Sequence, residues 1–154
     1  MARRRRINQI IDPVLSVEVA ATRVDQLVYL LVSNKPFKIG KYYSRIVCVG
    51  TTGSGVGRIA GSASKRIVQA IDNKSVPGIK RLDAFVVWAK RRKGPQTAKG
   101  RKLWNILERA LLLRFCAQYG TPPPLNGTGH KMKERSEFEV FTRVTVDRII
   151  NRYT

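Results

Sequence analysis

Glu108 is the residue whose surroundings most suggest chemistry, because it lies in a helical segment without a cation one turn away. Its neighbours three and four positions along include Trp104, Asn105, Leu111 and Leu112, so no Lys or Arg can form an ordinary surface ion pair with it. A carboxylate on an apolar helix face needs a partner, because burying it bare is costly. Two explanations stay open: a structural ion pair with a distant cation, or ligation of a metal ion.

Positive charge dominates the chain and is concentrated in a few segments. The 30 Lys and Arg residues stand against 10 Asp and Glu, a formal net charge of +20. No acidic residue occurs between Asp25 and Asp72 or between Asp83 and Glu108, so both strand-to-helix connections are basic. A polyphosphate backbone is the usual partner of such a charge. We therefore expect nucleic acid to be bound by an N-terminal arm and these connections, at Arg3, Arg4, Arg5, Arg6, Lys65, Arg91, Arg92 and Lys93.

Length and composition predict one self-folding domain, since the chain has 154 residues of which 43% are hydrophobic. No apolar run approaches the roughly 20 residues that span a bilayer. The arginine-rich N-terminus is not followed by the apolar segment of a secretory signal. Cys48 and Cys116 lie in apolar surroundings and do not form a typical zinc site with one histidine. We expect both to be reduced residues of a cytoplasmic protein.

Two further motifs indicate little. The string from Gly55 to Ala60 fits the glycine pattern of dinucleotide-binding loops, but no second strand ending in an acidic residue follows at the required spacing. His130 lies in a polar segment without a nucleophile pattern around it. We expect the glycines to allow close packing, and His130 to be exposed or to touch phosphate.

Local patterns predict the elements that position these residues. Apolar runs at 27–32 and 45–50 predict two antiparallel strands joined by a basic loop at 35–41, and 84–88 predicts a third strand. Helical spacing predicts helices at 56–72 and about 97–119, whereas 143–153 fits a strand or a helix. The first helix carries a polar stripe expected to face away from the core: Arg58, Ser62, Lys65 and Gln69.

The order of these elements and motifs resembles the GIY-YIG nuclease family. Leu27-Val28-Tyr29 is similar to the GIY tripeptide with only its Tyr kept, and Cys48-Val49-Gly50 is similar to YIG with its Tyr replaced. Arg58 falls eight residues after Gly50, as in the excision-repair members. The helix around Glu108 resembles the family's Glu-x-x-Leu-Ile helix, and Pro124-Leu125-Asn126 resembles its Pro-Leu-Asn ending. Ser62 stands where many members have His.

The resemblance implies an α+β fold, with a small three-stranded antiparallel sheet flanked by helices, and an endonuclease that hydrolyses phosphodiester bonds. It implies Mg²⁺, or another divalent cation such as Mn²⁺, ligated by Glu108. Tyr29 would then orient or deprotonate the water, Arg58 would hold the phosphate and Asn126 would brace the site. The role of the missing second Tyr would pass to Tyr43 or Tyr42, or to Lys41, which other cations surround.

The resemblance also implies three parts: a basic arm and short helix at 1–25, a nuclease core at 26–126 and a basic extension at 127–154. Double-stranded DNA is the expected substrate, and a homodimer would be needed to cut both strands of a palindrome. Two other functions stay open, because charge supports them equally. One is a non-catalytic DNA- or RNA-binding module on the same fold, and the other is an architectural protein in which Glu108 is only structural.

Overall fold

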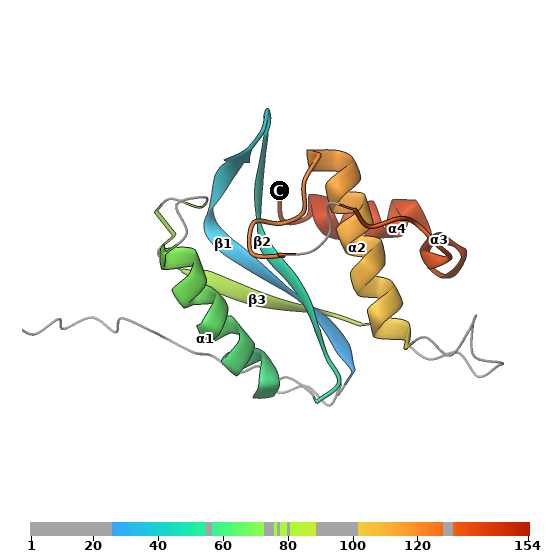
Figure 1. Ribbon diagram of the computed structural model, residues 1–154, viewed down its shortest axis with the longest axis horizontal. Helices are drawn as coiled ribbons and strands as arrows, with labels where there is room; N and C mark the ends of the chain where they lie inside the picture. Colours follow the sequence, from blue (N-terminus) through green and yellow to red (C-terminus); the bar gives the residue numbers. More distant parts are fainter. Residues whose placement is uncertain are drawn as a thin grey trace, which may run out of the picture.

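The computed structural model describes residues 26–54, 57–72, 76, 78–79, 81–88, 102–127 and 131–154. Within these ranges the chain forms a three-stranded antiparallel sheet in the order β2-β1-β3, with helices on both sides (Figure 1). The strands are β1 (Leu27–Ile39), β2 (Tyr42–Thr52) and β3 (Leu82–Val87). The helices are α1 (Gly57–Asp72), α2 (Leu103–Tyr119), α3 (Glu137–Val140) and α4 (Arg143–Asn151). The expected small α+β fold is confirmed.

The hairpin of β1 and β2 is much longer than its apolar runs predict. The expected basic loop at 35–41 is mostly strand, and the chain turns at Gly40. Its φ of 58° is a left-handed conformation that glycine adopts without steric strain. Pro36 suggested a loop, yet it lies in an irregularity between Val32 and Phe37 where β1 bulges away from β2. A bulge tolerates proline because the ladder there needs no N–H donor.

The register places side chains on two faces of the sheet. Tyr29 and Gly50 are cross-strand partners and share one face, where Ser62 of α1 contacts Tyr29. On the other face Phe85 packs against Tyr153, which follows α4, with ring centroids 4.5 Å apart. The sheet therefore lies between α1 on one side and α2 with α4 on the other (Figure 1).

Residues 131–154 belong to the core rather than to an extension. Val146 and Ile150 of α4 are buried among the sheet and α2 residues. Two hydrogen bonds of 2.6 and 2.8 Å join the Arg114 guanidinium of α2 to the Asp147 carboxylate of α4. The expected boundary at 127 is therefore corrected, and the segment that fitted either a strand or a helix is helical.

The other elements lie close to their predicted bounds, except at the start of α2. α2 begins at Leu103 because Lys102 still has an extended backbone, with ψ of 133°. It ends as expected at Gly120, whose N–H bonds to the Cys116 carbonyl at 2.8 Å. The arm at 1–25 and the start expected near 97 lie outside the described residues. Among the helices that are described, none is long and apolar enough to cross a membrane.

Candidate active site

Tyr29 lies across Gly50 on the α1 side of the sheet. The two residues are cross-strand partners, and a Cβ at Gly50 would overlap Cζ and the hydroxyl oxygen of Tyr29. Only glycine leaves the space that this ring occupies. Because β2 is an edge strand, the ring extends from β1 toward the free edge of the sheet. The two motif residues thus form one unit in space.

α1 brings two side chains to Tyr29 that we did not select from the sequence. Ser62 is half-buried and forms a side-chain hydrogen bond with Tyr29. The positive charge of Arg66 lowers the pKa of both Tyr29 and Cys48. Its Nη1 also donates to the Leu125 carbonyl at 2.8 Å. The polar stripe expected to face away from the core therefore borders this site.

The side chain of Asn126 hydrogen bonds to the free edge of β2 in the way that a neighbouring strand would. Its Nδ2 donates to the Val49 carbonyl at 2.7 Å, and its Oδ1 accepts from the Val49 N–H at 2.8 Å. The Leu125 N–H adds a bond of 2.9 Å to the Val47 carbonyl. These bonds satisfy backbone groups that an edge strand leaves open. They fix the segment after α2 directly beside the position of Gly50.

Glu108 is half-buried where α2 meets the end of β2. Burial raises the pKa of its carboxyl, whereas a hydrogen bond with the Thr51 side chain and the charge of Arg109 lower it. Its negative charge raises the pKa of Tyr29 and Cys48 in turn, which places it in the same neighbourhood. The ion pairs formed within the described part of the chain do not involve Glu108. Of the two explanations open from the sequence, the structural ion pair thus lacks a partner there.

Tyr29 and Cys48 both keep their protons at neutral pH. Burial raises the pKa of Tyr29 above its usual value, against the opposing effects of Ser62 and Arg66. Burial likewise raises the pKa of Cys48 to about 11. Cys48 is only 1% exposed. The Cys48 thiol, at the position where the resemblance predicts a second tyrosine, is therefore neutral and shielded from solvent.

Lys41 and Tyr43 are too distant to replace that tyrosine. Tyr43 precedes Gly50, the partner of Tyr29, by seven residues. At about 3.3 Å per strand residue, this separation is about 20 Å. Lys41 lies farther still, in the turn, and Tyr42 points to the α2 side. The expectation that one of these residues completes the site is corrected by this distance.

Arg58 is exposed and lies one turn before Ser62 in α1. Steps of four residues place Arg58, Ser62 and Arg66 in one row along the helix, a spacing from which the last two could have been found. Lys65 is exposed on the same helix. The other expected phosphate contacts lie outside the described residues, as does His130: Arg3, Arg4, Arg5, Arg6, Arg91, Arg92 and Lys93.

Among the residues that the structure describes, the site offers one carboxylate, that of Glu108, to a cation. Within the described ranges there is no cluster of three or more His, Cys, Asp and Glu side chains that could enclose a metal ion. Mg²⁺ is commonly held by one or two carboxylates, with substrate phosphates and water as the other ligands. Glu108, whose hydrogen-bond partner is the neutral hydroxyl of Thr51, fits that kind of site.

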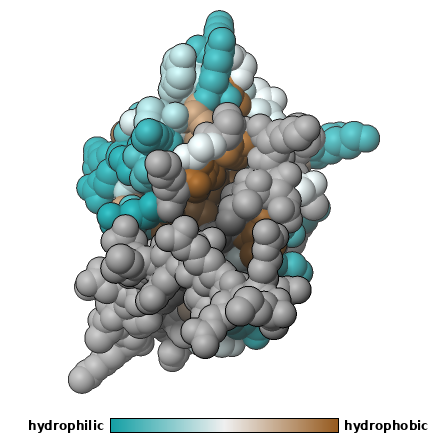
Figure 2. Space-filling model, turned by 90° about the vertical axis from the view of Figure 1, so that its left-hand side faces the viewer, coloured by the Kyte–Doolittle hydropathy of each residue, from teal (hydrophilic) through white to brown (hydrophobic). Residues whose placement is uncertain are grey.

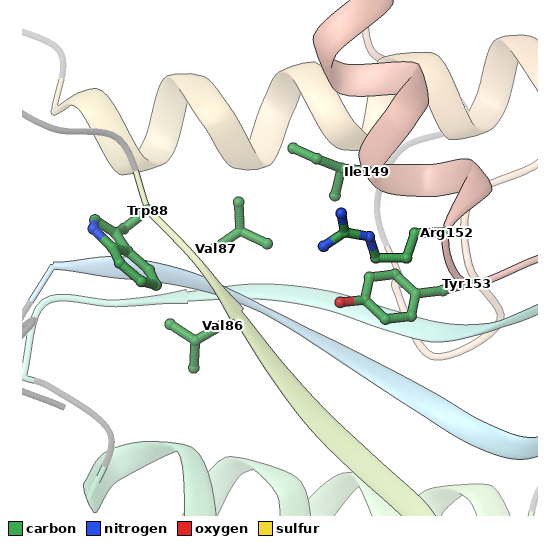
Figure 3. Close-up of a pocket in the computed structure, with 6 residues that line it drawn as sticks. All are labelled: Val86, Val87, Trp88, Ile149, Arg152 and Tyr153. Atoms are coloured by element: carbon green, nitrogen blue, oxygen red, sulfur yellow. The ribbon is translucent and has the colours of Figure 1, made fainter. Parts of the chain in front are cut away.

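A pocket at the opposite edge of the sheet has different chemistry. It has a volume of ≈ 210 Å³ and lies between β3 and α4, lined by Trp88, Arg152, Tyr153 and three aliphatic residues (Figure 3). None of these lining residues carries a carboxylate, thiol or imidazole. The pocket borders β3, whereas Tyr29 leans toward β2, so the two are separate features.

The resemblance to GIY-YIG nucleases stays a prediction from the order of the motifs in the sequence. Tyr29, Gly50, Glu108 and Asn126 all lie around the last residues of β2, although they come from four separate segments. Comparison of this chain with protein-family models, curated proteins and solved structures finds no match.

Proposed function

We propose that this protein is a metal-dependent endonuclease that hydrolyses phosphodiester bonds in nucleic acid, with DNA as the expected substrate. The supporting observation is the convergence of Tyr29, Glu108 and Asn126 on the end of β2, with Ser62 and Arg66 beside them. These residues come from distant parts of the sequence, and core packing alone does not require a hydroxyl, a carboxylate and a guanidinium at one place.

Phosphodiester hydrolysis needs a positioned water, positive charge on the phosphoryl oxygens and a stabilised leaving oxygen. Tyr29 keeps its proton, so its role is to orient the water through hydrogen bonds rather than to remove a proton from it. Arg58, which is exposed in the same row of α1 as Ser62, would contact the phosphate. Glu108 would hold the divalent cation, which supplies positive charge to the phosphoryl oxygens when bound.

Arg66 has a positioning role in this scheme. Its bond to the Leu125 carbonyl ties α1 to the segment whose next residue, Asn126, binds the edge of β2. Guanidinium has five donors in a fixed fork, so one side chain can keep this bond and still act on Tyr29 through its charge. Arg66 thus keeps α1, β2 and the segment after α2 in register around the site.

A non-catalytic nucleic-acid-binding module is the second candidate function. It is favoured by Cys48, because a buried neutral thiol cannot supply the hydrogen bonds of the tyrosine it replaces. Such a module would keep the charge of +20 and its affinity for phosphate, but it would not cleave the nucleic acid.

The test is incubation of the purified protein with supercoiled plasmid and with RNA, in Mg²⁺, in Mn²⁺ and in chelator. The endonuclease should cleave only with metal, and Tyr29→Phe should abolish cleavage while the ring still covers Gly50. Binding without cleavage in either metal would support the non-catalytic module. Absence of binding would exclude both functions.

A further inference from the structure

The outer part of the β1–β2 hairpin projects beyond the helices. We call residues 33–45 the distal hairpin; it forms the upper tip of the molecule in Figure 1. Figure 2 shows the same tip as a column of mostly hydrophilic side chains standing above the rest of the surface. Its exposed residues include three cations and no acid: Lys35, Lys38 and Lys41. The tip is thus a narrow positively charged ribbon.

The register determines which way the distal hairpin faces. Ser44 forms a side-chain hydrogen bond with Tyr119 of α2, and the Tyr42 ring meets the Tyr119 ring edge-on at 6.0 Å. Ser44 and Tyr42 therefore point to the α2 side. Lys38 and Tyr43 are cross-strand partners between these positions, so they point to the opposite side of the ribbon.

That opposite side is the α1 side, on which Tyr29 lies. Tyr43 is 61% exposed there, an unusual exposure for a large aromatic side chain, and Lys38 is directly across from it. α1 covers the sheet near Tyr29, whereas the exposure of Lys38 and Tyr43 shows that the distal hairpin is bare on this side. A cationic aromatic surface thus begins about 20 Å from Tyr29 on the same face.

We infer that the distal hairpin holds double-stranded nucleic acid against the face containing Tyr29. A two-stranded ribbon fits the major groove of a duplex, where lysines reach phosphates on both sides. Tyr43 would pack against sugar or base at the centre of the ribbon. A separation of about 20 Å corresponds to about six base-pair steps, so one duplex can contact Tyr43 and also reach the surface next to the buried Tyr29. The inference rests on the proposed function for its substrate and adds the mode of binding.

The role of the distal hairpin can be tested without cleavage. The affinity for a duplex of about 20 base pairs is measured across about 50 to 200 mM salt in the presence of chelator. Replacing Lys35, Lys38 and Lys41 with Ala should lower the slope of log affinity against log salt by about 2.7, since each phosphate contact contributes about 0.9. Tyr43→Ala should weaken binding roughly tenfold and leave the slope unchanged, because it removes packing and no charge.

The matched control replaces three exposed cations beside α3: Lys131, Lys133 and Arg135. These variants should all have the melting temperature of the wild type, because the replaced side chains are exposed. An unchanged slope in the hairpin triple variant, or an equal drop in the control, would overturn the inference. So would equal affinity for a single strand of the same length. Because these measurements exclude metal, they can establish duplex binding by the distal hairpin even if plasmid cleavage fails. Cleavage can likewise be established even if the hairpin does not bind the duplex.

Discussion

Replacing Glu108 with Gln separates the site role of this residue from a structural one. Gln keeps the shape of the side chain and can still hydrogen bond to Thr51, the partner that Glu108 has in the fold. Burial raises the pKa of Glu108, so the fold disfavours its ionised form. The stability that this group contributes is present below its unfolded pKa and is lost as pH rises through the higher folded pKa. Glu108→Gln should therefore be as stable as the wild type, or slightly more stable, at neutral pH.

Glu137 supplies the matched control, because it is a buried glutamate that forms an ion pair within the described part of the chain. Glu137 is 0% exposed, accepts from Arg109 Nε at 2.8 Å and from the Arg135 N–H at 2.7 Å. Removing one partner of a buried pair costs about 3 to 5 kcal/mol. For a protein of this size that is a fall of about 10 to 15 °C in melting temperature. Glu137→Gln should show such a fall, and Glu108→Gln should stay within about 2 °C of the wild type.

Three measurements on both variants decide the matter: melting temperature, affinity for a DNA duplex, and plasmid cleavage in Mg²⁺. We expect Glu108→Gln to lose cleavage and to bind DNA at least as tightly, because a negative charge has left a phosphate site. A melting temperature as low as that of Glu137→Gln would show that Glu108 is structural. Normal stability with full cleavage would refute its assignment to the site.

Three further substitutions or modifications test the geometry around β2. Gly50→Ala should displace the Tyr29 ring, since its Cβ would overlap Cζ, and should reduce cleavage as much as Tyr29→Ala does while duplex affinity is kept. Asn126→Ala should lower the free energy of unfolding by about 2 kcal/mol in denaturant melts, because the Val49 N–H and carbonyl lose their partners; an unchanged midpoint would contradict this. Cys48, buried and with its pKa raised to about 11, should be alkylated at mildly alkaline pH only after denaturation, as peptide mapping by mass spectrometry can show.

Much of the fold follows from local patterns. The apolar run at 27–32, the helical spacing that ends at Gly120 and the clustering of positive charge each depend on neighbours a few positions apart. The same is true of Glu108, because the absence of a cation three or four positions away in its helix can be read from the sequence alone. The length of the hairpin was missed, because Pro36 is a loop signal unless a bulge absorbs it, and a bulge depends on pairing with another strand.

The candidate site itself depends on contacts across the fold. The bonds between Val49 and Asn126 join residues 77 positions apart, and no local pattern specifies such a pair. Ser62 could be placed on a helix face from its spacing, but only the packing of α1 against the sheet turned that face toward Tyr29. Sequence therefore determined which residues have unusual chemistry, since side-chain type and helical or strand period are local properties. Tertiary structure decided which of them meet, because strand register set the distance that separates Tyr43 from Tyr29 and brings Gly50 beneath its ring.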